Sequence, residues 1–575
     1  MSEKELRIKG GDTILAMIKN FSATEKVVFG ALTLLLLLSA FLLFKNANEL
    51  FMKSVPTKGG ELSEGVIGFP RLINPVLAFS DVDRDLTSLV YSGLMKYQNG
   101  KIVPDLAQSY TISNDGLTYT FTLKDSLRFQ DDTQLTTDDV EFTINKVQDA
   151  GLKSPRRADW ANVSVKKVGS NQIQFILKQP YAPFITNATL GILPKHIWKN
   201  VNTDQFIFSQ YNIQPIGSGA YKLDSIQRDS GGIPTSYTLT PWDGYGNGSP
   251  FISKLSINFF EDETAERAAF ENNAIESVSS LSPVHVAQIA SSTSHIKIFT
   301  APLPRIFAVF FNQNQSPVLA DATVRQALNM AVDKKDIVKN VLYGYGNTID
   351  GPVPSDETDA SATSTSNIDA AKNLLAKAGW APNSKGILEK KDKKAGTTTL
   401  AFSISTSDSP DLKRTADILK KEWTALGAKV DVKVFESSDL NQNVIQPRKY
   451  DAILFGESVG KDLDLYAFWH SSQRNAPGLN IAMYVNPKAD KLLEDARATP
   501  DKTIRDAKYV AFENLLTTDM PAVFLYSPDF IYIVPDKIKG MQEGPIAMPS
   551  DRWNGVSTWF TDTENVWNIF VKQKN

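Results

Sequence analysis

The chain has 575 residues, of which 42% are hydrophobic, 22% charged and 10% aromatic, a composition typical of packed globular proteins and not of disordered or fibrous ones. Its formal net charge of −3 comes from 61 basic and 64 acidic residues that are interspersed, so no basic stripe predicts a nucleic-acid partner. The chain contains no cysteine, which excludes an acylated lipoprotein anchor and suits an oxidising compartment.

One uncharged hydrophobic run, residues 27–44, stands apart from the rest of the sequence. A helix of that length nearly crosses a hydrocarbon core of about 30 Å. A cleaved signal peptide has a shorter apolar stretch followed by an Ala-x-Ala-like site, and nothing after Phe44 offers such a site. We therefore predict an uncleaved transmembrane signal anchor over 27–44, with a cleaved signal as the competing interpretation.

Basic residues predict the orientation of this anchor. Five precede the run and three follow it: Lys4, Arg7, Lys9, Lys19 and Lys26, then Lys45, Lys53 and Lys58. The bias predicts a cytoplasmic segment 1–26, a tether 45–58 and a large body on the extracytoplasmic face of the cell membrane. The opposite orientation, with the body inside, is the alternative.

The body begins with β-rich patterns. Residues 59–68 alternate as a first strand, and 81–95 keep helical spacing from Asp81. Residues 118–124 alternate apolar and polar after an Asn114-Asp115-Gly116 turn, which predicts a hairpin. A helix opens at Thr136 with Val140, Phe142, Ile144 and Val147 as its candidate core residues. Farther along, 163–177 and 235–260 are rich in strand patterns, and 263–274 is predicted as a helix.

The second part of the body has α/β patterning. The apolar run 304–312 is typical of a strand buried on both faces. Helices are predicted at 320–342 and 367–378, with a loop at 355–366 between them. Then come a strand (398–404), a helix (411–426) and two strands (429–435 and 451–455). This alternation predicts an α/β lobe with a largely parallel sheet.

No pattern for covalent chemistry or metal binding is present. The four histidines, His196, His285, His295 and His470, form no His-x-x-x-His pair. Gly217-Ser218-Gly219 lacks the spacing of a hydrolase elbow, and the glycines at 244–248 do not open a helix that could hold phosphate. We therefore predict a binding protein that is not an enzyme and has no metal or cofactor.

Several segments together resemble the extracellular solute-binding proteins of family 5, the oligopeptide-, dipeptide- and nickel-binding type that serves ABC importers. The segments 102–110, 113–124 and 135–140 are similar to the signature region of that family, in order and at its spacing. The likeness continues in 193–197, 215–221, 324–328 and 484–490, and it covers nearly the whole chain from Gly59.

This resemblance implies an α/β fold of the periplasmic-binding-protein type: a two-lobed clamp with a small inserted domain. Lobe I would comprise 59–90, 206–303 and 533–575, lobe II 91–205, and lobe III 304–532. Ligand would be buried between lobes I and III. Lobes joined by two crossing strands can hinge, so a ligand that touches both lobes stabilises the closed form.

The resemblance also implies a ligand segment at 450–470. Backbone groups of Gly456, Glu457 and Ser458 would bind a peptide main chain, although Glu457 stands where peptide binders commonly have tryptophan. Either Asp462 or Asp464 would pair with a ligand ammonium, and spacing does not choose between them. The remaining candidates for the ligand site are Tyr466, Trp469, Asn480 and Tyr526.

The function expected from these features is a membrane-anchored receptor, monomeric, that captures oligopeptides and delivers them to ABC transporter permease subunits. Similar proteins bind oligosaccharides or metal chelates, and a cleft-facing His470 would favour the latter. A surface sensor or scaffold without transport is the alternative from another class.

Overall fold

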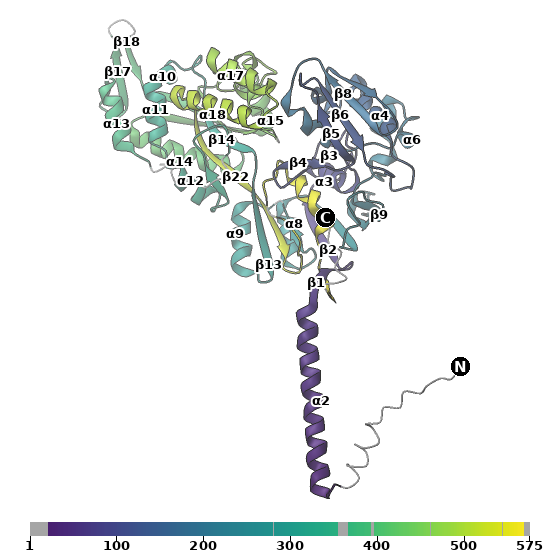
Figure 1. The fold of residues 1–575 in the computed structure, drawn as a ribbon. Helices are drawn as coiled ribbons and strands as arrows, with labels where there is room; N and C mark the ends of the chain where they lie inside the picture. Colours follow the sequence, from purple (N-terminus) through teal and green to yellow (C-terminus); the bar gives the residue numbers. More distant parts are fainter. Residues whose placement is uncertain are drawn as a thin grey trace. The chain divides into compact units, whose positions relative to one another are not determined.

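The structure is a computed structural model that describes residues 21–279, 281–354, 366–392, 396–460, 462–542 and 544–567. The chain forms two compact units (Figure 1). The small unit comprises Met1–Thr57 and Asp562–Asn575, and the large unit Lys58–Thr561.

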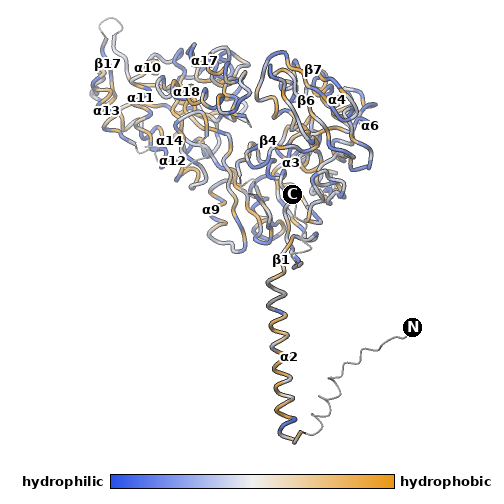
Figure 2. The backbone as a smooth tube through the Cα atoms, in the orientation of Figure 1, coloured by the Kyte–Doolittle hydropathy of each residue, from blue (hydrophilic) through white to orange (hydrophobic). Residues whose placement is uncertain are grey.

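The small unit contains one long helix and a two-stranded ribbon. Helix α2 (Ala23–Phe51) includes the predicted span 27–44, and its hydrophobic residues run along most of its length (Figure 2). Within the described residues it is the one helix long and apolar enough to cross a membrane, over Ala23–Lys45. The predicted tether 45–58 is helical to Phe51 and then forms β1 (Met52–Pro56), which pairs antiparallel with β23 (Thr563–Trp567).

A mixed sheet runs through the large unit in the order β20-β19-β21-β14-β22-β12-β2-β11-β10-β9. Strand β22 (Ala522–Pro535) is the longest in this sheet and pairs with four strands, β12, β13, β14 and β15. Its first part pairs with β14 (Arg305–Phe311), and its second part pairs with β13 (Ile296–Pro302). The same strand therefore joins two halves of the unit (Figure 1). In this sheet, the first half contains β2 and β9 to β13, and the second half contains β14, β15 and β19 to β21.

The first half contains the hairpin-rich region. Strand β2 (Glu61–Ile67) lies parallel to β11 (Lys254–Phe260), which continues to β10 (Pro234–Pro241) and β9 (Tyr221–Arg228). The predicted hairpin is confirmed, because β5 (Ala107–Ile112) pairs antiparallel with β6 (Thr118–Leu123). A separate four-stranded sheet includes this hairpin and shares one hydrophobic core with the β2 sheet.

The helix predicted at 81–95 is shorter in the structure. Helix α3 (Asp81–Val90) starts at the Ser80 cap and ends where Tyr91 becomes extended. Gly93 then forms a bridge with Gly191, and a Cβ at Gly93 would lie 2.7 Å from the Thr189 backbone. This close backbone approach requires extended chain, so apolar spacing alone placed the helix end too late.

The second half has the predicted β-α-β order but a more mixed sheet. Strand β19 (Ala401–Ser407) is parallel to β20 (Lys429–Phe435) and to β21 (Ala452–Ser458). Strands β14 and β22 are antiparallel to their neighbours, so the expected largely parallel sheet is parallel on one side only. Strand β14 is buried on both faces as predicted, with Ile306 in one hydrophobic cluster and Val309 in another.

The predicted helix 320–342 is broken in two. Helix α11 (Ala322–Met330) ends before Asp333, whose side chain caps the start of α12 (Lys334–Val341). An N-cap residue has non-helical dihedral angles, and this one interrupts an otherwise continuous apolar spacing.

The remaining elements complete both halves. Their bounds are β3 (Met95–Gln98), β4 (Lys101–Pro104), α4 (Thr137–Gln148), η1 (Ala150–Leu152), α5 (Arg157–Trp160), β7 (Val163–Lys167), β8 (Gln172–Leu177), η2 (Ala182–Thr189), α6 (Lys195–Trp198), α7 (Thr203–Phe206), η3 (Gln210–Asn212), α8 (Glu263–Glu271), β12 (Ser277–Val278), α9 (Pro283–Ser292), α10 (Pro317–Ala320), β15 (Gly346–Thr348), α13 (Ile368–Lys377), β16 (Trp380–Pro382), β17 (Leu388–Asp392), β18 (Gly396–Thr399), α14 (Pro410–Leu426), α15 (Ser437–Asp439), η4 (Leu440–Ile445), α16 (Tyr466–Trp469), η5 (Ser471–Gln473), α17 (Pro487–Ala498), α18 (Lys502–Asp519) and η6 (Pro549–Thr558).

The two halves are connected where β13 passes into β14 and where β22 changes partner. Ser527, at the second crossing, donates from Oγ to the carbonyl of Leu303, at the first, over 3.0 Å, and this bond is buried. Prolines flank both positions, at Pro302, Pro304 and Pro528. A hinge between the halves would bend at these two adjacent crossings.

A buried ionic network packs η6 against the first half. The Arg552 guanidinium donates to Glu64 on β2, over 2.6 Å, and to Asp85 on α3, over 2.6 and 2.8 Å. Tyr532 of β22 donates its hydroxyl to Glu64 as well. Burial raises the pKa of Asp85 to about 6, although the adjacent Arg552 acts in the opposite direction. This network joins four elements: η6, β2, α3 and β22.

Candidate functional site

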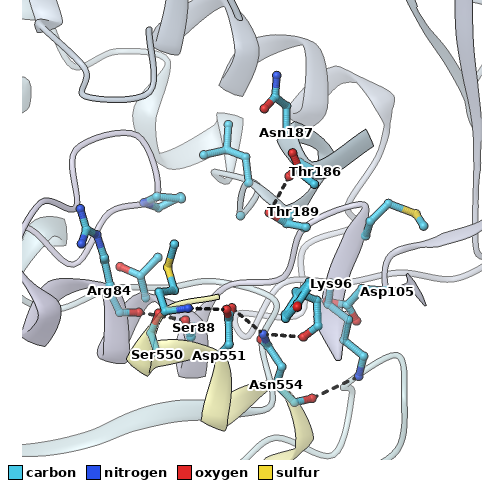
Figure 3. A pocket seen from close by; sticks show the side chains of 18 of the residues that line it. Arg84, Ser88, Lys96, Asp105, Thr186, Asn187, Thr189, Ser550, Asp551 and Asn554 are labelled. Carbon is cyan, nitrogen blue, oxygen red and sulfur yellow. Dashed lines mark hydrogen bonds between the residues drawn. The ribbon is translucent and has the colours of Figure 1, made fainter. Parts of the chain in front are cut away.

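A cavity of about 350 Å³ lies inside the large unit, with walls from both halves. The first half contributes α3, β3, α5, η2 and η6, and the second half contributes the loop that follows β21. Figure 3 shows Thr186, Asn187 and Thr189 of η2 on one side of this space and Ser88, Asp551 and Asn554 on the other. A partly open cavity with walls from both halves has the arrangement that ligand sites between lobes require.

Side chains of both charges line the cavity. The basic residues are Arg84, Lys96 and Arg156, and the acidic ones are Asp105, Asp159, Asp462, Asp464 and Asp551. Arg84 lies 3.3 Å from Asp81, with both side chains substantially exposed, and Arg156 lies 3.1 Å from Asp159. The lining can therefore meet positive and negative groups of one ligand.

Burial raises the pKa of two of these aspartates. Asp105 accepts a hydrogen bond from Asn247 and lies 3.5 Å from the Tyr245 hydroxyl, and burial raises its pKa while Lys96 opposes the rise. Burial likewise raises the pKa of Asp159, against the effect of Arg156. Asp551 is occupied by the backbone, because its Oδ2 accepts from the amides of Ala547 and Met548 at 3.0 Å each. These three carboxyls help to build the walls.

Asp464 forms a bidentate ion pair with Arg497 of α17. The guanidinium donates from Nε and Nη2 to its carboxylate over 2.7 to 3.0 Å. Tyr181, at the start of η2 in the first half, donates its hydroxyl to Asp464 Oδ2 over 3.2 Å. Burial and this carboxylate both raise the pKa of Tyr181. Asp464 thus holds the two halves together across the cavity rim.

Asp462 lies in the loop between β21 and α16, and its half-buried side chain lines the cavity. The loop turns sharply, with positive φ at Gly460 (74°) and Leu463 (48°). Its first amide, at Val459, donates to the carbonyl of Pro304 over 2.8 Å, which fixes the loop beside the hinge. Of the two aspartates that the sequence left open, Asp462 is the one that is not held by Arg497.

The three predicted backbone positions of β21 do not line the cavity as side chains. Gly456 faces Phe307, and a Cβ there would lie 2.7 Å from its ring, which stacks on Tyr526. Ser458 is exposed at the strand end. Glu457 is 4% exposed, and neither of its carboxylate oxygens has a hydrogen-bond partner among the described residues. Burial raises the pKa of Glu457 well above its usual range.

Three other predicted residues are buried in the second half and are not among the cavity-lining residues. Trp469 packs against Phe310 and Phe524, and Tyr526 is buried against Phe307. Asn480 binds backbone groups: its Nδ2 donates to the carbonyls of Trp469, His470 and Tyr484, and its Oδ1 accepts from the Tyr484 amide. In this structure all three stabilise the second half and do not face the cavity.

Tyr466 and His470 form a stack near the cavity rim. Their rings lie 4.1 Å apart and nearly parallel, and the Arg497 guanidinium lies 4.1 Å from the Tyr466 ring centre on α16. His470 is 7% exposed and does not line the cavity. Among the described residues no group of three His, Cys, Asp or Glu side chains could hold a metal ion.

Sequence reasoning missed the walls that the first half supplies. Arg84 and Ser88 lie on one face of α3, whose opposite face was visible as an apolar stripe, so they read as solvent-facing polar residues. The apolar residues of the η2 and η6 segments do not recur at a regular helix or strand spacing. Small polar residues at 186–189 were the one local signal for η2, and residues 550–554, which include Arg552 and Trp553, gave no such signal.

Comparison with known proteins agrees with this architecture. A family model described as bacterial extracellular solute-binding proteins, family 5, matches residues 101–478. The oligopeptide-binding protein AppA of Bacillus subtilis is 29% identical over 544 residues, covering 91% of this chain and 97% of AppA.

Solved structures show the same fold. AppA from Bacillus subtilis in complex with a nonapeptide superposes with a TM-score of 0.67 at 28% identity, over 88% of this chain and all of that one. CtaP from Listeria monocytogenes gives 0.74 at 26%, and NikZ from Campylobacter jejuni in complex with Ni(L-His) gives 0.67 at 26%, with the same coverage. The predicted two-lobed α/β clamp is confirmed. The chain therefore belongs to the bacterial extracellular solute-binding proteins of family 5.

Proposed function

We propose that this protein is a membrane-anchored extracellular receptor that captures oligopeptides in the cavity between its halves and delivers them to the permease of an ABC transporter. It performs no covalent chemistry in this role. The family and the apolar helix α2 support the proposal at the level of the whole chain.

The observation that carries the peptide assignment is the lining of the cavity. Arg84 and Arg156 on one set of walls and Asp462 on another provide charges of both signs in one chamber. A peptide has an ammonium at one end and a carboxylate at the other, and charge-assisted hydrogen bonds to both ends fix its direction. One relative, AppA of Bacillus subtilis, is named for oligopeptide binding.

Within this proposal Asp462 binds the ligand ammonium. Asp464 is already engaged by two guanidinium nitrogens and by Tyr181, so using it would break the contact that joins the halves. Asp462 reaches the same cavity from a loop that is fixed to the hinge at Pro304.

Metal-chelate cargo receives no support from the side chains. No histidine is among the residues that line the cavity, and His470 is buried beside Tyr466. The anchor has a physical use for a receptor: a tethered binder stays near its permease at a high effective concentration.

The first test identifies the natural ligand. The full chain is purified in nanodiscs from cells grown in rich medium, and native mass spectrometry is followed by denaturation to release bound molecules. A series of peptide masses supports the proposal. Hexose-spaced masses or metal chelates would contradict the peptide assignment. A protein that carries no peptide and binds none when peptides are added would contradict the proposed role as a peptide receptor.

The second test addresses Asp462. Calorimetry compares a tripeptide with its N-acetylated form, which lacks the ammonium. We expect Asp462→Asn to weaken binding of the free tripeptide by about 10- to 100-fold and to abolish discrimination against the acetylated form.

Asp464→Asn is the matched control, because it lies two residues away and lines the same cavity. It should weaken both peptides equally and preserve the discrimination, since it loosens the contact with Arg497 and Tyr181. If Asp464→Asn, and not Asp462→Asn, abolished discrimination, the ammonium assignment would move to Asp464.

A further inference from the structure

The ribbon formed by β1 and β23 brings the last described strand of the chain back to the end of helix α2. Five residue pairs form it, from Met52 opposite Trp567 to Pro56 opposite Thr563. The ladder continues beyond the strands, because the Thr57 amide donates to the carbonyl of Asp562 over 3.1 Å. A contact between residues some five hundred positions apart thus lies directly beside the apolar helix.

An aromatic pair closes the end of the ribbon nearest to the helix. Phe51, the last residue of α2, stacks on Trp567 of β23 with ring centres 6.4 Å apart and an interplanar angle of 15°. Both residues are partly exposed, 58% of Phe51 and 40% of Trp567. Partly exposed stacked aromatic rings are favourable at a lipid headgroup layer, where Trp is enriched.

The position along the helix fits that layer. Phe51 lies about 9 Å beyond Lys45, where the apolar segment ends, at 1.5 Å per residue. The headgroup region extends about 5 to 8 Å beyond the hydrocarbon on each side. The Phe51 backbone is therefore about 1 Å beyond the outer boundary of the headgroups when α2 spans the membrane upright, a distance that an aromatic side chain can bridge.

The ribbon also lacks the support that such a structure needs in water. Among the described residues its sheet has two strands and no third, and two-stranded ribbons alone are marginally stable. None of its residues is fully buried: Met52, Val55 and Pro56 of β1 and Val566 of β23 are half-buried, and the others are exposed. The headgroup layer suits the amphipathic Trp567 ring, which has an apolar body and a polar N–H.

We infer that the β1–β23 ribbon is a membrane-proximal joint whose Phe51–Trp567 pair binds the lipid headgroup layer and which attaches the large unit to the anchor through two chain segments. These segments pass through Thr57–Lys58 and Thr561–Asp562. This inference rests on the membrane anchoring in the proposed function.

The strand pairing is tested by disulfide formation, which the absence of cysteine makes unambiguous. Lys53→Cys with Val566→Cys places two cysteines directly opposite each other. Lys53→Cys with Thr563→Cys is the out-of-register control, because Thr563 pairs with Pro56. In the full chain in phosphatidylglycerol–phosphatidylethanolamine nanodiscs, we expect about tenfold more cross-link in the first variant, since disulfides require Cα atoms within about 7 Å.

Lipid contact is tested by a fluorescent label at Asn565→Cys, which leaves Trp567 in place. Lipids with a quencher in the headgroup should quench this label at least about twofold more than one at Lys420→Cys, an exposed residue of the large unit. Adding Trp567→Ala to the Asn565→Cys variant should remove most of the difference.

The outcomes separate the joint from the anchor. Equal cross-linking of the two cysteine pairs, or equal quenching at Asn565 and Lys420, overturns the joint even if the protein stays in the membrane. Release of the full chain from membranes by a carbonate wash overturns the anchoring as well. Retention in the membrane with selective cross-linking and quenching supports both.

Discussion

Glu457 is an acidic residue in an environment that disfavours its charged form. Its carboxyl is buried on β21 without a hydrogen-bond partner among the described residues, beside the strand end that leads to Asp462. Burial raises its pKa well above the usual range, so the folded protein favours the protonated form. An ionised carboxylate in this environment would oppose folding.

This position makes stability depend on pH in a definite direction. Because the folded-state pKa of Glu457 exceeds the unfolded value, its contribution to stability is present below the unfolded pKa and is lost as pH rises through the folded pKa. Glu457→Gln cannot ionise, so its free energy of unfolding, measured with urea, should increase relative to the unsubstituted protein as pH rises.

Ser458→Ala is the control for this experiment, because it changes an exposed neighbour on the same strand. Its stability profile should run parallel to that of the unsubstituted protein between mildly acidic and alkaline pH. A parallel profile for Glu457→Gln too would show that the carboxyl is hydrated or paired, and the burial argument would fail.

Among the elements, η6 depends most strongly on one interaction. Arg552 holds it to β2 and α3 through two carboxylates that are themselves almost fully buried. The same short helix supplies Asp551 and Asn554 to the cavity wall (Figure 3). Loss of the guanidinium would leave two adjacent buried carboxylates with no cation.

Arg552→Met should therefore reduce the free energy of unfolding by about 3 to 5 kcal/mol, the range found when one member of a buried ionic group is removed. Combining it with Glu64→Gln and Asp85→Asn should restore part of that loss, because no carboxylate then remains unpaired. Urea unfolding measures both effects. A loss under about 1 kcal/mol in the single variant would mean that water replaces the guanidinium.

At the scale of the whole molecule, two chain crossings join the halves and one cavity lies between them. The hydrogen bond from Ser527 to Leu303 ties the crossings together, and the contact between Tyr181 and Asp464 joins the halves on the cavity side. A ligand that contacts the walls of both halves stabilises the arrangement in which the halves are close together, relative to one in which they are apart.

Peptide binding should consequently protect both halves together. At a ligand concentration one hundred times Kd, the stability of the large unit should rise by about 2.7 kcal/mol. Hydrogen exchange should slow in the loop 459–464 and in η2 and η6 at the same time. Protection limited to one half would contradict binding between the lobes, and the unliganded Asp462→Asn variant provides the baseline.

The periodicity of apolar residues predicted element bounds well where an element depends mainly on its own residues. Strand β20 has the predicted bounds of 429–435, and α14 begins one residue before the predicted start. Strand β19 begins three residues later than expected, because Gly396–Thr399 forms a separate strand, β18, with β17. Alternation identifies a strand but not which neighbour it joins.

The sequence by itself determined the anchor-like helix, the order of strands and helices, and the family, because these depend on apolar runs, side-chain period and spaced motifs. Only the tertiary structure decided which aspartate is engaged by Arg497, which predicted ligand residues lie in the core, and which walls enclose the cavity. Asp464 and Arg497 are thirty-three positions apart, and Tyr181 is two hundred and eighty-three from Asp464. Contacts across such separations arise from packing between elements, and no local pattern along the chain encodes them.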